Sequence, residues 1–69
     1  MILEGGLMQV SLKAMRIHAG MNQKEAAELI EVSASTLAKW EDKKVYPDAE
    51  QLIRLCKVYG CSIDDISIL

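Results

Sequence analysis

The chain has 69 residues, of which 51% are hydrophobic and 26% are charged, a balance typical of one small soluble domain. Eight Lys and Arg against ten Asp and Glu give a net charge of −2, which argues mildly against nucleic-acid binding because nucleic-acid binders are usually basic. A chain this short offers little scaffold around a catalytic cleft, so we expect that the protein is not an enzyme.

The basic residues are unevenly distributed, and their placement weakens the argument from net charge. One group lies in a segment free of acidic residues and a second group follows near the middle of the chain. The basic residues of these groups are Lys13, Arg16, Lys24, Lys39, Lys43 and Lys44. The sequence therefore predicts local basic patches on an acidic body, which an anionic partner can contact.

Cys56, Cys61 and His18 are the cysteines and the histidine of the chain, too few for a four-ligand metal site. We expect no metal and no cofactor. A disulfide between the two cysteines is an alternative that the sequence leaves open. The N-terminus lacks the basic and long apolar segments of a signal peptide, and no apolar run reaches the length of a membrane span. We therefore expect a cytoplasmic protein with no membrane partner.

Residues 1–9 read as an N-terminal tail, and residues 10–69 as the folded domain. Gly5 and Gly6 interrupt any helix in the tail, although several of its residues are apolar. Two interpretations remain, a terminus folded over the core and an arm or strand that joins a second copy. We favour the first because termini are usually held weakly.

Helix signals occupy the rest of the chain. Leu12, Met15 and Ala19 repeat at helical spacing before Gly20, which favours a helix end. Asn22 with Glu25 forms a capping box at the start of a second helix. Two small residues there, Ala26 and Ala27, allow a neighbouring helix to approach closely and cross over a short turn.

Three further helices are expected. Ser33 caps one that runs from residue 34 to about residue 42, and Asp48 caps the next with Gln51 as its partner. Ser62 caps a last short helix that carries Ile63 and Ile66. Because no alternating apolar pattern occurs after residue 10, we predict an all-α fold, a compact bundle of five helices that contains a helix-turn-helix.

The chain resembles the lambda repressor and Cro-like (XRE-type) helix-turn-helix regulators over residues 11–66. The matching segments are LKAMR from residue 12, MNQKEAA from residue 21, VSASTLAKWE from residue 32, Pro47 and YGCSIDDI from residue 59. The resemblance implies double-stranded DNA as partner, usually bound by a dimer. Glu31 and Lys43 stand where this family often has Gly, and Ala26 replaces a more usual Leu.

The resemblance implies which residues meet DNA. The candidates for base contacts are Ala34, Ser35 and Lys39, and the candidates for phosphate contacts are Gln23, Lys24, Ser33, Lys43 and Lys44. The resemblance implies that Gln23 can also brace the recognition helix. The side chains of Ala34 and Ser35 can contact several bases, so they do not indicate which base is recognised. Lys39 can bind a phosphate instead of a base. Thr36 is more simply a packing or backbone-bonding residue.

Arg16 and Glu41 match a pair of residues that forms a buried ion pair in several members of this family. Both lie beside expected core residues, Met15 and Trp40. We therefore expect the pair to tie the first helix to the end of the third. Two separate surface charges are the plainer interpretation.

The expected function is sequence-specific binding of double-stranded DNA by a transcriptional repressor that acts as a homodimer. A small-molecule ligand is not expected. The alternative is a protein-interaction module, such as an antitoxin, that uses the same bundle; the acidic net charge favours this alternative and the basic cluster opposes it. For the dimer we expect apolar residues of the tail or of the C-terminus, Ile66, Ile68 and Leu69, to be covered by a second copy.

Overall fold

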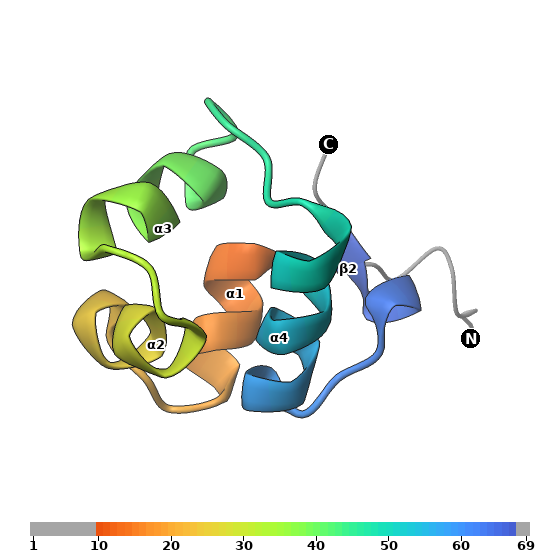
Figure 1. Ribbon diagram of the computed structural model, residues 1–69. Helices are drawn as coiled ribbons and strands as arrows, with labels where there is room; N and C mark the ends of the chain where they lie inside the picture. Colours follow the sequence, from red (N-terminus) through yellow and green to blue (C-terminus); the bar gives the residue numbers. More distant parts are fainter. Residues whose placement is uncertain (1–9, 68–69) are drawn as a thin grey trace.

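The structure is a computed structural model that describes residues 10–67, and this part of the chain holds four α-helices around one core (Figure 1). Two short strands and one turn of 3-10 helix, Ile63–Asp65, complete it. The helices are α1 (Leu12–His18), α2 (Gln23–Ile30), α3 (Ala34–Glu41) and α4 (Ala49–Tyr59), and the strands are β1 (Val10–Ser11) and β2 (Ile66–Ser67). The predicted helical bundle is confirmed.

Side chains three residues apart cap the helices. At α2 the Asn22 side chain accepts from the Glu25 backbone N–H at 2.8 Å, and the Glu25 carboxylate accepts from the Asn22 N–H at 2.9 Å. Asp48 and Gln51 make the same reciprocal pair at α4, at 2.8 and 2.9 Å. Each pair satisfies two backbone donors that a helix start leaves open, so the two predicted capping boxes are confirmed.

The core lies where α2 meets α3 and α4. Ile30, Leu37 and Leu55 are its largest fully buried side chains. Ala26 and Ala27 are 0% and 2% exposed at the crossing, where larger side chains would hold the helices apart. The remaining buried apolar residues are Leu12, Met15, Trp40, Cys56, Tyr59 and Ile66.

The prediction of a fifth α-helix is wrong. Only the 3-10 turn Ile63–Asp65 forms there, and the chain then becomes extended as β2. The expectation of no strand after residue 10 is also wrong, because β1 and β2 pair in parallel, with Val10 opposite Ile66. A two-residue strand is too short to show alternation, and its partner lies at the other end of the domain.

Ile66 is buried in its own chain, with 5% of its surface exposed. The expectation that a second copy must cover this residue is therefore wrong, because the pairing of β2 with β1 already holds it against the core. Residues 1–9, Ile68 and Leu69 lie outside the described residues, so the predicted tail stays a prediction. Within residues 10–67 no helix is long and apolar enough to cross a membrane.

Candidate nucleic-acid interface

The turn between α2 and α3 is a left-handed reversal at Glu31. This residue has φ 68° and ψ 41°, in the region that favours glycine. The Val32 N–H then donates to the Ala27 carbonyl at 3.0 Å, which closes the end of α2. The helix-turn-helix therefore forms with a glutamate at a position where the family often has glycine, and the left-handed backbone of this glutamate costs about 1 kcal/mol.

The first turn of α3 presents its side chains to solvent. Ala34 and Ser35 are both exposed there. Ser33 caps the helix by accepting from the Thr36 N–H at 3.0 Å, and its hydroxyl donates to the Thr36 hydroxyl at 2.9 Å. The Ser33 hydroxyl is thus already engaged in the cap, whereas Ser35 stands on the open surface.

One face of α3 is buried and the opposite face is exposed. Leu37 and Trp40 are 0% and 3% exposed and anchor the helix on the core. Lys39 is exposed and lies four residues after Ser35, so these two share the outer face. This geometry leaves a polar and basic surface along α3 that a DNA groove can approach.

Lys43 and Lys44 extend the basic surface beyond α3. The helix ends at Glu41 with Asp42 as its C-cap, and Lys43 takes a left-handed φ of 63°. The Lys44 N–H then donates to the Lys39 carbonyl at 3.0 Å, which keeps this turn close to the last turn of α3. Both lysines are exposed. Figure 1 shows this green segment projecting beyond α3 before the chain enters α4.

A buried ion pair holds α1 against the end of α3. Arg16 Nε lies 2.7 Å from Glu41 Oε2, and Arg16 Nη2 lies 3.3 Å from Oε1. The two side chains are 9% and 2% exposed. Arg16 Nη1 also donates to the Met21 carbonyl at 2.9 Å. The hydrogen bond with Glu41 raises the pKa of Arg16 above its already high value, so the guanidinium stays charged.

Gln23 is the third member of this network. Its Nε2 donates to Glu41 Oε1 at 2.9 Å, which ties the first residue of α2 to the last residue of α3. The geometry gives Gln23 a bracing role, and a phosphate contact would use its second amide N–H or the backbone. Lys24 follows it and is exposed at the same helix start, where the helix dipole also favours an anion.

The structure brings most candidate residues into two groups. The contact between Gln23 and Glu41 joins the start of α2 to the end of α3, where the basic turn of Lys43 and Lys44 follows. Ser33, Ala34 and Ser35 lie at the other end of α3, beside the end of α2. The acidic side chain of Glu31 is turned to α4, where its carboxylate lies 3.6 Å from Arg54.

Tyr59, in the last turn of α4, is a neighbour of this network. It is 7% exposed, and its hydroxyl has no hydrogen-bond partner among the described residues. Burial first, and the charge of Glu41 next, raise the pKa of Tyr59 to about 12. No signal in the sequence marks this hydroxyl, because its lack of a partner results from how α4 packs on α1.

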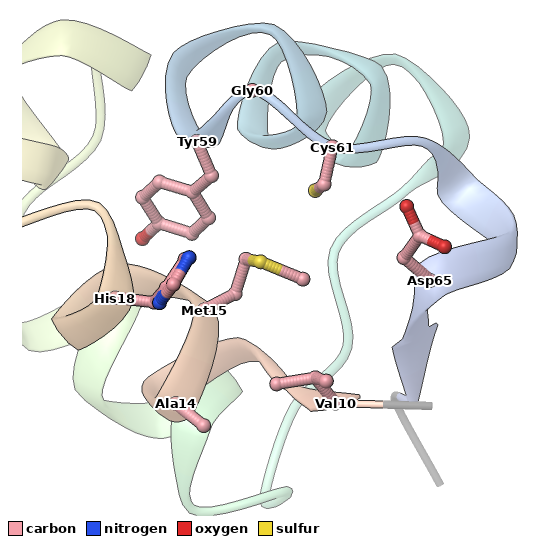
Figure 2. A pocket seen from close by; sticks show the side chains of 8 residues that line it. All are labelled: Val10, Ala14, Met15, His18, Tyr59, Gly60, Cys61 and Asp65. Atoms are coloured by element: carbon pink, nitrogen blue, oxygen red, sulfur yellow. The ribbon is translucent and has the colours of Figure 1, made fainter. Parts of the chain in front are cut away.

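A pocket of about 520 Å³ opens next to Tyr59, between α1 and the end of α4 (Figure 2). Met15 forms part of its floor, and Cys61 and Asp65 line its wall near the 3-10 turn. Residues 10–67 contain no cluster of three His, Cys, Asp or Glu side chains that could hold a metal ion. None of the candidate DNA-contact residues lines this pocket.

Comparison with known proteins gives four findings. A family model described as Helix-turn-helix matches residues 12–66. The chain is 33% identical over 61 residues to the HTH-type transcriptional activator BcrR of Enterococcus faecalis, covering 86% of this chain and 30% of the relative. It is 38% identical over 53 residues to the HTH-type transcriptional regulator ImmR of Bacillus subtilis (strain 168), covering 77% of this chain and 42% of the relative. No solved structure matches.

Proposed function

This chain belongs to the helix-turn-helix family, and from that premise we propose that it binds double-stranded DNA and regulates transcription. The chain spans less than half the length of the two regulators. Their names therefore support this function for the chain but do not establish it. The observation that carries the proposal is the exposed face of α3, anchored on the core by Leu37 and Trp40 and braced at its end by buried Glu41.

In the proposed complex the first turn of α3 enters the major groove. Ala34 offers a methyl group to a thymine methyl, and Ser35 offers a hydroxyl that pairs with several bases. Lys39, one turn further along the same face, reaches a guanine or a phosphate. Their exposure on a helix whose opposite face is buried supports this assignment.

Phosphate contacts come from both ends of the helix-turn-helix. Gln23 and Lys24 open α2, where backbone N–H groups also point outward. Ser33 caps α3, and to contact a phosphate its hydroxyl would rotate away from Thr36 and donate its O–H, or a water would bridge the two groups. Lys43 and Lys44 follow α3 on an exposed turn.

We further propose that two copies bind a two-fold-related operator and that the bound protein represses by occupying a promoter. Two copies would place two α3 helices in successive major grooves, as two-fold helix-turn-helix dimers do. One relative is named an activator, so a reporter assay with its own upstream DNA decides the direction of regulation. Sedimentation of the chain alone and with DNA tells whether the dimer forms before or on the operator.

Salt dependence tests the phosphate contacts. Lys39, Lys43 and Lys44 of two copies meet about six phosphates, so these lysines alone should make the logarithm of affinity fall against the logarithm of salt with a slope of about −5. Replacing Lys43 and Lys44 with Gln should flatten the slope by up to about four units on any DNA sequence. Lys57→Gln is the matched control, since it removes an exposed charge from α4 and should leave the slope unchanged.

The variant Ser35→Ala tests the base contacts. It should weaken operator binding by about 1–3 kcal/mol at most and leave non-specific binding unchanged, because a base contact carries no backbone affinity. Competition between operator and non-specific DNA in a fluorescence-anisotropy titration measures this difference. Binding that ignores salt and all changes at Ala34, Ser35 and Lys39 would reject the proposal and favour a protein-interaction module.

A further inference from the structure

Cys56 and Cys61 meet across the end of α4. Gly60, between them, has a left-handed φ of 73°, and it turns the chain back on the helix. The Cys61 N–H donates to the Cys56 carbonyl at 3.0 Å. A backbone hydrogen bond between residues five apart brings their Cα atoms within the range of about 4.4–6.8 Å that disulfides span.

Their side chains also belong to one packed region. Both cysteines are free thiols, and Cys61 packs against the core that contains Cys56. In a helix cap of this kind, the side chains of the two residues joined by the backbone hydrogen bond frequently touch. Cys56 is 7% exposed within the core, and Cys61 is half-buried against it. The α4 cap therefore places the two thiols near each other before any bond joins them.

The two thiols differ in access to solvent. Cys61 lines the pocket of about 520 Å³, and Figure 2 shows its sulfur atom pointing into that space. Cys56 is buried and does not line the pocket. A reagent can thus reach Cys61 first, with Cys56 positioned to complete the reaction. Burial raises the pKa of Cys61 to about 11, so few of these thiols are ionised near neutral pH and the attack is slow.

We propose that Cys56 and Cys61 are an oxidative modification site that forms an intramolecular disulfide by exchange with a low-molecular-weight disulfide of the glutathione class. The Cys61 thiolate attacks the reagent, forms a mixed disulfide and releases one reagent thiolate. The Cys56 thiolate then attacks the Cys61 sulfur and releases the second. The reagent gains two electrons, the two protein thiols lose them, and the two protons leave with the reagent thiols.

The new bond would lock the α4 cap to the segment that leads to β2. That segment carries the 3-10 turn and ends in the strand that pairs with β1. None of the candidate DNA-contact residues lies in the cap or in this segment. The modification therefore stabilises the end of the domain away from α3 and leaves DNA binding unchanged.

Equilibration of the full chain with reduced and oxidised glutathione tests the proposal. Free thiols are trapped by alkylation, and mass spectrometry gives the ratio of oxidised to reduced protein. This ratio yields the effective concentration of one thiol at the other, in native buffer and in urea. We expect a native value at least about tenfold above the unfolded value, because the folded cap holds the thiols together. Linkage then makes the oxidised protein the more stable form, with a higher melting temperature. An equal or lower native value, or disulfides between chains, overturns the proposal.

Single variants test the order of attack. Cys56→Ser should retain glutathione on Cys61, because no second thiol displaces it. Cys61→Ser should react with the reagent at least about tenfold more slowly, because Cys56 is buried. Equal rates in the two variants would overturn the assignment of Cys61 as the first thiol. The wild-type equilibrium tests the disulfide itself even if one variant folds poorly.

Discussion

Removal of the Arg16 side chain should unfold much of the protein. The variant Arg16→Ala deletes a guanidinium that makes two contacts with Glu41, at 2.7 and 3.3 Å, and one with the Met21 carbonyl at 2.9 Å. The Glu41 carboxylate, whose side chain is 2% exposed, would keep only the Gln23 amide at 2.9 Å. One amide cannot neutralise a buried negative charge.

The expected loss is large relative to the stability of so small a domain. Breaking a buried ion pair costs about 3–5 kcal/mol because the remaining charge stays in a low-dielectric environment. Small domains at the low end of the usual range have unfolding free energies of about 5 kcal/mol. We therefore expect Arg16→Ala to lower the melting temperature by at least about 12 °C, at about 4–8 °C for each kcal/mol.

Thermal and urea unfolding followed by far-ultraviolet circular dichroism measure this loss. Lys13→Ala is the matched control, because Lys13 is an exposed cation on the same helix and its removal should change stability by less than about 0.5 kcal/mol. The double variant Arg16→Met with Glu41→Leu removes both charges and should recover much of the loss. An Arg16→Ala protein that melts within a degree or two of wild type would show that the pair contributes nothing to stability.

Two further predictions concern single residues of the fold. Glu31→Gly should raise the unfolding free energy by up to about 1 kcal/mol, because the left-handed φ of 68° strains a glutamate. The 3.6 Å contact of Glu31 with Arg54 is exposed, so its loss should cost little. A lower melting temperature of the variant would contradict this prediction. Tyr59→Phe should stabilise the protein by up to about 1 kcal/mol because it removes a buried hydroxyl without a partner. The pKa of Tyr59 rises from 10.0 to about 12 on folding, so wild-type stability should be complete below pH 10 and fall as the pH rises towards 12. Urea unfolding at alkaline pH tests whether Tyr59 causes this loss of stability. If Tyr59→Phe loses stability as steeply as wild type, another group is responsible.

Local hydrogen bonds explain why much of the fold could be predicted. The caps of α2 and α4 join residues three apart, Asn22 with Glu25 and Asp48 with Gln51, so the residue types alone indicate the helix starts. The left-handed turn at Glu31 also follows from position, because the matched family places glycine there. Membership of that family, and with it the outer face of α3, could be predicted from such short motifs.

Contacts between distant residues decided the rest. Val10 pairs with Ile66, and this pairing replaces the expected fifth helix with a 3-10 turn and a strand. The Gln23 amide turns to Glu41, eighteen positions away in the chain, and the Tyr59 hydroxyl lies buried without a partner. Capping depends on neighbours within one helical turn, so sequence alone determines it. These three features depend on which side chains share a buried volume, and that is known only once α1, α3 and α4 have packed together.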